Sequence, residues 1–296
     1  MVNAGQLGKQ DFINENEKAE GLRIVPFNEN IDLKQASYDI TPTIIAMSSK
    51  LGLLETVYRD KDEPSKYYIM VKPRDSVLVV SKEYFEVPSD IAGYVVSRLS
   101  KVAEGFGHIS TSIDPNWKGA LLIGLSNPTN KALKVYVGGD RADSAKGFAL
   151  ATVSFHYLNI SCNSQPPDED FKGMRLDLLN QIQYSKRAGM KAWLNRLIHF
   201  KRRKFTDAFF RYIGGRVIGA DNWEGIAKTL CGEPADNVFA KYIVQENTVY
   251  RFLRWLKEHW KAVVLFIAVL LCLAGAVSDE AKEKITEVLE AFLRLF

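Results

Sequence analysis

The stretch that decides the fold of this 296-residue chain is Ser97–Asn127, SRLSKVAEGFGHISTSIDPNWKGALLIGLSN. It begins with the pair Ser97-Arg98, directly after a short apolar run. A turn follows at 113–119, IDPNWKG, in which Asp, Pro and Asn are strong turn formers. The turn leads into Ala120–Asn127, a second apolar run that ends in a polar residue. This pattern is typical of strands joined by a loop and a tight turn.

The same stretch contains the side chains that a nucleotide site needs, which are cations and hydroxyls for phosphates, an aromatic wall and a carboxylate. Each candidate also has a purely structural interpretation. Arg98 can pair with an acid at a subunit interface, Asp114 can simply form the turn, and Trp117 can pack in the core. The candidate nucleotide-binding residues are Arg98, Ser100, Lys101, Ser110, Asp114 and Trp117, and Asp114 is the candidate catalytic residue if the protein is an enzyme.

Short apolar runs separated by turn residues extend over 31–160 and predict an antiparallel β domain. Residues 1–30 are predicted to form a polar arm, and 161–170 a linker that contains two prolines and three acids. The predicted strands are Tyr67–Val71, Ser76–Val80, Gly93–Val96, Ala120–Leu125, Leu133–Val137 and Phe148–Leu158.

The composition restricts the class of protein. Hydrophobic residues make up 47% of the chain, as in globular proteins that bury a core, and the net charge of +4 is mildly basic. The three cysteines, Cys162, Cys231 and Cys272, lack C-x-x-C spacing. The absence of this spacing argues against a disulfide framework or a zinc site and favours a reducing compartment. The first residues contain no apolar stretch, so no signal peptide is expected.

Apolar residues at helical spacing, among them Leu176, Leu179 and Ile182, predict a helical connector over 171–250. From Lys186 to Lys204 this segment has eight Lys or Arg residues and no acid. These basic residues can contact anionic lipid, lie on a solvated helix face or bind nucleic acid. Because no other feature of the sequence supports nucleic-acid binding, no nucleic acid is expected as a partner. The lipid interpretation predicts membrane contacts by Lys186, Arg187, Lys191, Trp193, Arg196, Lys201, Arg202, Arg203, Lys204, Trp255 and Trp260.

A run of sixteen residues without a charged side chain, Ala262–Val277, follows this connector. At ~1.5 Å per residue a helix of this length spans roughly 24 Å, slightly less than a ~30 Å hydrocarbon core. With its flanks it predicts one transmembrane helix over 251–278, and the basic residues before it place the N-terminal part in the cytoplasm. A buried core helix is the alternative. Residues 279–296 are predicted to form an amphipathic helix.

Several motifs, in the same order along the chain, resemble the dCTP deaminase/dUTPase family. They are Ala36–Ile40 (ASYDI), Val71–Val79 (VKPRDSVLV), Glu86–Gly93 (EVPSDIAG), the Ser97–Asn127 stretch and a closing strand at Phe148–Leu158. The resemblance covers 31–159 and implies a distorted antiparallel β-barrel or jelly roll that assembles as a trimer, with nucleotide sites between subunits. The expected fold class is therefore a mainly β N-terminal domain followed by an α-helical C-terminal region with one transmembrane helix.

The chain departs from the family pattern at the positions that carry the chemistry. Leu99 replaces the second serine after the arginine, and Ser112 replaces an arginine of the deaminases. Gly124 occupies the position of their general-base glutamate, and a glycine cannot move a proton. Asp114 is retained; in dUTPases the equivalent aspartate orients the water that attacks a magnesium-bound triphosphate.

The sequence therefore predicts a membrane-anchored nucleotide-binding protein that is catalytically impaired and acts as a nucleotide sensor or membrane effector, with antiviral defence as an analogy. One alternative is an active enzyme, either a dUTP or dNTP pyrophosphatase using Mg²⁺ or a divergent dCTP deaminase in which Glu104 supplies the missing carboxylate. Another is that the β domain serves only as an oligomerisation module.

Overall fold

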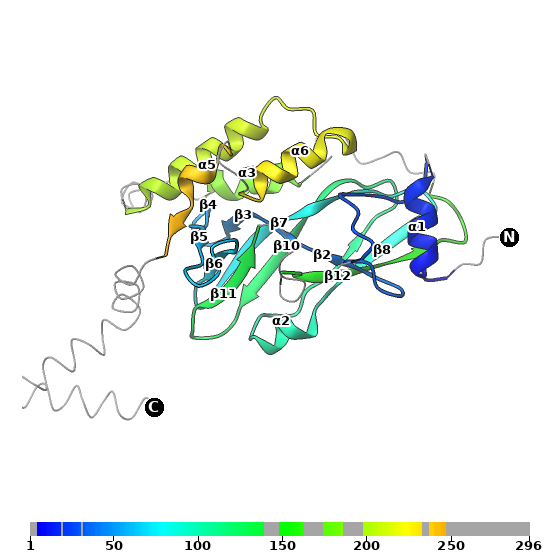
Figure 1. Ribbon diagram of the computed structural model, residues 1–296, viewed down its shortest axis with the longest axis horizontal. Helices are drawn as coiled ribbons and strands as arrows, with labels where there is room; N and C mark the ends of the chain where they lie inside the picture. The colour runs from blue at the N-terminus through cyan, green and yellow to red at the C-terminus, as the bar shows by residue number, and fades with distance from the viewer. Residues whose placement is uncertain are drawn as a thin grey trace, which may run out of the picture. The chain divides into compact units, whose positions relative to one another are not determined.

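The computed structural model describes residues 5–18, 20–30, 32–138, 148–162, 174–185, 198–232 and 237–246 (Figure 1). Apart from Glu246, these residues fall in one compact unit, Met1–Gln245. The predicted linker at 161–170 lies almost entirely outside the described residues, so the predicted domain boundaries stay predictions.

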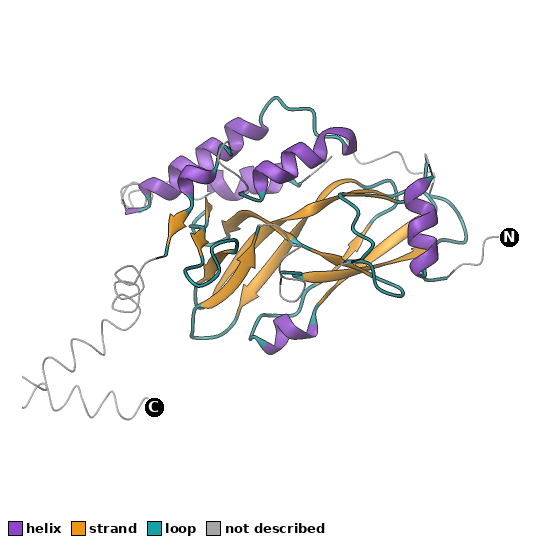
Figure 2. Cartoon of the chain, in the orientation of Figure 1, coloured by secondary structure: helices purple, strands orange, loops and turns teal. Residues whose placement is uncertain are grey.

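Strands are the main regular elements of the described chain before residue 160, and helices are the main ones after that point (Figure 2). The strands are β1 (Arg23–Val25), β2 (Tyr38–Ile40), β3 (Pro42–Ser48), β4 (Leu53–Leu54), β5 (Tyr58–Arg59), β6 (Tyr67–Val71), β7 (Asp75–Glu86), β8 (Ile91–Ser97), β9 (Ser110–Ile113), β10 (Lys118–Asn127), β11 (Leu133–Val137), β12 (Ala151–Tyr157) and β13 (Val244–Gln245). The helices are α1 (Lys9–Glu17), α2 (Leu99–Ala103), α3 (Leu176–Ser185), α5 (Phe200–Ile213), α6 (Ala220–Leu230) and the 3-10 helix η2 (Ala240–Tyr242).

The strands form three sheets. One has the order β1-β7-β3-β4 with β10 also on β7, the second β11-β6-β5-β13 and the third β2-β12-β8-β9. Their pairs are antiparallel except for β13, which runs parallel to β5. The long strand β7 joins β1, β3 and β10, and its buried apolar residues belong to the main hydrophobic core. The mainly β N-terminal domain predicted from the sequence is therefore confirmed.

A helical layer covers one side of the β7 sheet (Figure 1). Helix α6 contacts β7, β3 and β1, and α5 contacts β4. Residues Ala220, Trp223, Ile226, Ala227 and Leu230 are the buried residues of α6. Their spacing of three to four residues gives the helix one apolar face, and that face lies against the sheet.

Two polar side chains of α5 hold this helix to β4. The Nη2 atom of Arg202 lies 2.7 Å from Oε1 of Glu55, and the two side chains are 9% and 6% exposed. Arg202 Nε donates to the carbonyl of Leu54 at 2.9 Å, and the Leu54 amide donates to the hydroxyl of Thr206 at 2.9 Å. The helix thus satisfies both backbone groups of Leu54, which leaves little freedom in how α5 docks.

The predicted transmembrane helix and membrane location are corrected by this structure. Within the residues that it describes, no helix has both the length and the apolarity that crossing a bilayer requires. The longest, α5, has 14 residues, or roughly 21 Å, and carries four consecutive Lys and Arg residues near its start. The segment on which the prediction rested, Ala262–Val277, lies outside the described residues.

The predicted lipid contacts divide into two groups. Lys201, Arg202, Arg203 and Lys204 lie on α5, where Arg202 is buried against Glu55 and so cannot contact lipid. Arg203 pairs with Asp207, and the Lys204 ammonium lies 4.5 Å from the centre of the Phe200 ring. The remaining candidates, Lys186, Arg187, Lys191, Trp193, Arg196, Trp255 and Trp260, lie outside the described residues.

A buried carboxylate lies where the chain passes from one sheet to another. Thr41 separates β2 from β3, and both its amide, at 2.9 Å, and its hydroxyl donate to the carboxylate of Glu83. Burial raises the pKa of Glu83 from its ordinary value of 4.5 to about 7, although the Thr41 hydrogen bonds oppose this rise.

This pKa predicts that stability falls as pH rises. Between pH 4.5 and 7 the folded state holds a proton on Glu83 that the unfolded state has lost, so the stabilisation present below pH 4.5 disappears as pH approaches 7. The expected loss is roughly 3 kcal/mol. Urea denaturation from pH 4.5 to 8 measures it. Glu83→Gln should flatten the profile by that amount, and parallel profiles for the two proteins would contradict the assignment.

Candidate functional site

The register of the β2-β12-β8-β9 sheet brings distant residues into one row. Asp39 lies opposite Thr152, Thr152 lies opposite Val96, and Val96 lies opposite Ser110. Directly opposed residues in antiparallel strands share a face of the sheet. Arg98 lies two residues after Val96, at the start of α2, so it is next to the point where this row crosses β8.

Arg98 is oriented by a buried carboxylate of the same chain. Its Nη1 donates to Oδ2 of Asp39 at 2.9 Å, and the Arg98 side chain is 29% exposed. Asp39 is 2% exposed, and its other oxygen accepts from the hydroxyl of Thr152 at 3.0 Å. Within the described part of the chain, Nε and the second Nη of Arg98 form no hydrogen bond. The guanidinium is therefore fixed on one side and keeps a two-donor edge for an anion.

The other candidates near Arg98 differ in how available they are. Ser100 and Ser110 are exposed, so their hydroxyls can reach a ligand. Lys101 is 4% exposed, and its ammonium donates to both carboxylate oxygens of Glu104 at 3.0 and 2.9 Å. The Lys101 ammonium is thus already paired at α2, and the Glu104 carboxylate is its partner.

Asp114 and Trp117 lie at the opposite end of β9 from Arg98. Asp114 lies four residue steps after Ser110 along the extended strand, a distance of about 13 Å. The Asp114 carbonyl accepts from the Trp117 amide at 3.2 Å, and Asn116 has φ 63°, the geometry of a type II turn with proline in its second position. The carboxylate of Asp114 is exposed, while Trp117 is half-buried against the core and donates Nε1 to the carbonyl of Gly119 at 3.0 Å. One copy of the chain therefore does not bring Arg98 and Asp114 together.

The three positions that depart from the family pattern are all exposed. Leu99 and Ser112 lie at the surface, and Gly124 is exposed on β10. A Cβ added at Gly124 would meet Cδ2 of Leu78 at 3.7 Å, which is ordinary van der Waals contact. The glycine is not required by crowding, so the missing carboxylate is a chemical difference and not a packing constraint.

Apolar side chains surround this end of the sheet. Tyr94 and Val96 on β8 are 54% and 42% exposed, and Leu99 and Val102 on α2 are 83% and 38% exposed. Large apolar side chains that gather on one surface commonly mark a contact site. Sequence reasoning did not identify this surface, because β8 alternates between inward and outward residues that are both apolar.

Asp39 is the main site residue that sequence reasoning missed. It stands in the ASYDI motif at 36–40, so the motif was recognised but the role of its acid was not. Its partner Arg98 is 59 positions away, and only the sheet order β2-β12-β8 brings the two together.

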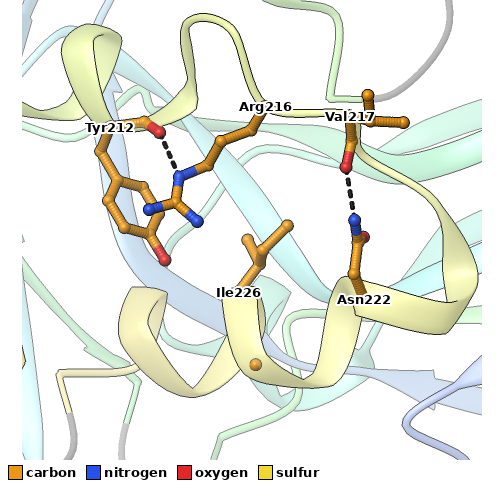
Figure 3. Close-up of a pocket in the computed structure, with 6 residues that line it drawn as sticks. Tyr212, Arg216, Val217, Asn222 and Ile226 are labelled. Atoms are coloured by element: carbon orange, nitrogen blue, oxygen red, sulfur yellow. Dashed lines mark hydrogen bonds between the residues drawn. The ribbon is translucent and has the colours of Figure 1, made fainter.

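An open pocket of about 410 Å³ lies elsewhere, between the end of α5 and α6 (Figure 3). Its lining residues are Tyr212, Arg216, Val217, Asn222, Gly225 and Ile226. The Arg216 guanidinium stacks 4.1 Å from the centre of the Tyr212 ring, and its Nε donates to the Tyr212 carbonyl. All of these residues belong to the helical layer, so this pocket is separate from the site around Arg98.

A resident metal site is not evident in the described residues, where no group of three or more His, Cys, Asp and Glu side chains is placed to hold an ion. The exposed carboxylate of Asp114 could add one ligand to a Mg²⁺ held mainly by nucleotide phosphates.

Comparisons with known proteins show which family the β domain is similar to. Residues 7–140 match the family model described as dCTP deaminase-like. The dCTP deaminase of Buchnera aphidicola is 26% identical over 135 residues, which are 45% of this chain and 61% of that protein. The dCTP deaminase of Pyrococcus horikoshii is 29% identical over 117 residues, 40% of this chain and 69% of that protein. The chain thus spans less than two thirds of the Buchnera protein.

Solved structures of similar proteins include the 2'-deoxycytidine 5'-triphosphate deaminase of Agrobacterium tumefaciens, with 13% identity, a TM-score of 0.39 and coverage of 52% of this chain and 48% of that one. A dUTPase of Staphylococcus bacteriophage 80alpha, solved with dUpNHpp, has 12% identity, a TM-score of 0.30 and coverage of 51% and 99%. The similarity rests on the family model and the curated relatives, and these structural likenesses carry no argument. Residues 7–140 of this chain are therefore similar to the dCTP deaminase-like family.

Proposed function

We propose that the dCTP deaminase/dUTPase-like domain binds a pyrimidine deoxynucleotide through its phosphates, works as a homo-oligomer and does not deaminate the base. The observation that carries this proposal is the guanidinium of Arg98, fixed by buried Asp39 and left with two donors for an anion. A fork of N–H donors suits the oxygens of a phosphate, and the exposed hydroxyls of Ser100 and Ser110 add further donors nearby.

The proposal of a homo-oligomer, with a trimer favoured by the family resemblance, rests on two observations. Arg98 and Asp114 lie at opposite ends of β9, so a site that uses both would take them from different copies. The apolar surface formed by Tyr94, Val96 and the two α2 residues Leu99 and Val102 is suited to cover by another copy.

The proposed lack of deaminase activity follows from the missing proton carrier. Gly124 stands where the related deaminases carry a general base, and glycine has no side chain to take a proton from water. The alternative carboxylate, Glu104, is held by both of its oxygens on the Lys101 ammonium.

A direct test is titration calorimetry of the full chain with dCTP, dUTP and dTTP in EDTA. We expect one of them to bind, and Arg98→Met to weaken that binding about tenfold to a hundredfold, because it removes a charged donor from the phosphates. Arg74→Met is the matched control, since Arg74 is an exposed arginine whose Nε donates to Oδ1 of Asn130. If no nucleotide binds, the domain is an oligomerisation module and the proposal fails.

A second candidate function, hydrolysis of dUTP or another dNTP, is favoured by the exposed carboxylate of Asp114. Incubation of the same protein with dCTP or dUTP and Mg²⁺, followed by chromatography, separates the cases. Release of pyrophosphate that Asp114→Ala abolishes would establish the pyrophosphatase. Formation of dUTP or dUMP from dCTP would establish a divergent deaminase and overturn the proposed lack of deamination.

A further inference from the structure

We propose that the pocket between α5 and α6 binds a small organic anion that has one carboxylate on an apolar body. This site goes beyond the proposed nucleotide site around Arg98, because it lies in the helical layer, at residues 212–226, outside the part of the chain that matches the family model. Its volume of about 410 Å³ falls within the range of small-molecule sites, which is roughly 300–1,000 Å³.

The charged group of the pocket is the guanidinium of Arg216, and two contacts fix its position. Its Nε donates to the Tyr212 carbonyl at 2.6 Å, and the guanidinium lies 4.1 Å from the centre of the Tyr212 ring. That ring packs edge-on against Phe239, which is 0% exposed. In the described part of the chain the two Nη atoms of Arg216 form no hydrogen bond or ion pair. They therefore keep a planar pair of donors for a carboxylate.

The charge of the pocket favours a ligand with a single negative charge. The residues that line it include one arginine and no acid. Asp221, which precedes Asn222 on α6, is paired with Arg23 of β1 at 2.9 Å. A phosphate monoester carries close to two negative charges at neutral pH, whereas a carboxylate carries one. One guanidinium therefore matches a carboxylate better than a phosphate.

The side of the pocket opposite Arg216 is apolar and firmly held (Figure 3). Ile226 of α6 lines it and is 5% exposed, while Val217 in the preceding loop is 84% exposed. Asn222 holds this loop, because its Nδ2 donates to the Val217 carbonyl and its Oδ1 accepts from the Gly219 amide at 3.0 Å. The Asn222 amide is thus used within the protein, and the apolar surface remains for the body of a ligand.

Gly225 keeps the pocket open. It is the sixth of the eleven residues of α6, and glycine inside a helix is destabilising relative to alanine. Packing does not require a glycine here, because a Cβ at Gly225 would meet no atom within 4 Å in the described part of the chain. Gly225 does line the pocket, so a side chain at this position would take the space of the ligand. A role in binding explains a residue that helix stability disfavours.

Titration calorimetry of the full chain with naphthoate and its neutral analogue naphthamide tests the charged part of the site. Naphthoate should bind about tenfold more tightly than naphthamide, and Arg216→Met should remove this difference without changing the affinity for naphthamide. Arg211→Met is the matched control, because Arg211 is an exposed arginine of α5 whose Nε also donates to the carbonyl four residues before it. No binding of naphthoate at millimolar concentration, equal affinity for the two probes, or tighter binding of naphthyl phosphate would each overturn the inference.

The variant Gly225→Leu tests the position of the site. It should abolish naphthoate binding while the melting temperature stays the same or rises, because leucine fills the pocket and favours the helix. Gly225→Ala should give a smaller loss of affinity and provides a milder change if the leucine variant unfolds. Unchanged affinity for naphthoate in both folded variants would place the probe elsewhere and contradict the inference. Saturating dUTP should not displace naphthoate, and displacement would show that the two sites are one, against this inference but not against nucleotide binding.

Discussion

Replacing Trp223 by alanine should lower the free energy of unfolding by about 3–5 kcal/mol. The Trp223 side chain is 0% exposed between α6 and the β7 sheet, and its ring centre lies 5.6 Å from that of Tyr84. Its Nε1 donates to the carbonyl of Lys82 at 2.6 Å. The alanine variant loses this ring and leaves a cavity beneath the helical layer, and a domain of ordinary stability can be nearly unfolded by such a loss.

Urea denaturation monitored by circular dichroism measures this effect. Trp223→Phe keeps most of the ring and loses the hydrogen bond to Lys82, so it should cost clearly less than the alanine variant. Tyr184→Ala in α3 is the control for a large side chain that is 64% exposed, and it should change stability little. An equal, small effect of all three substitutions would show that the helical layer does not stabilise the sheet.

Replacing Arg202 by methionine should destabilise the protein by about 3–5 kcal/mol, because it leaves a buried carboxylate without its cation. Burial already raises the pKa of Glu55, and the Arg202 charge opposes that rise. Without Arg202 the pKa of Glu55 should rise further. The deficit should then be small in acid, where Glu55 is protonated in both states, and should grow as pH rises above the ordinary carboxyl value.

A double variant distinguishes the ion pair from simple packing. Arg202→Met combined with Glu55→Leu removes both charges and should recover most of the stability, since an apolar pair often replaces a buried ion pair without loss. Lys201→Met, on the exposed side of the same helix, is the matched control. If the double variant is no more stable than Arg202→Met alone, the bond from Arg202 to the Leu54 carbonyl is the main anchor.

The β domain was largely predictable because its strands are short apolar runs bounded by turn residues. The run Tyr67–Val71 is β6 with the same ends, and Ser76–Val80 lies within the longer β7. The turn at 114–117 was also predictable, because proline and asparagine occupy the positions that a type II turn demands. In these segments the local sequence is sufficient to determine the structure.

The docking of the helices was not predictable in the same way. Arg202 stands in a run of four basic residues, KRRK, that reads as a solvent or lipid face. Its burial depends on Glu55, which is far away in the sequence and becomes a neighbour only when α5 meets β4. Charge patterning alone cannot separate a basic residue that pairs inside the protein from its exposed neighbours.

The candidate site was predictable in part. Arg98, Ser100 and Ser110 lie at one end of the β9 region, but Lys101 is engaged by its own helix and Asp114 lies at the other end. The short spacing along the chain suggested that these site residues form one cluster, because residues at the two ends of a short strand are close in sequence. The strand itself, nearly 13 Å of extended backbone, keeps them apart.

The parallel pairing of β13 with β5 has a consequence for the design of shortened chains. Val244 and Gln245 cover the backbone N–H and C=O groups along one margin of the β11-β6-β5 sheet. An uncovered margin of this kind is a template for pairing with other molecules. A fragment that stops near residue 160 would expose this margin together with the apolar floor under α6. Self-association of such a fragment would then report on exposed strands and not on the assembly of the intact protein.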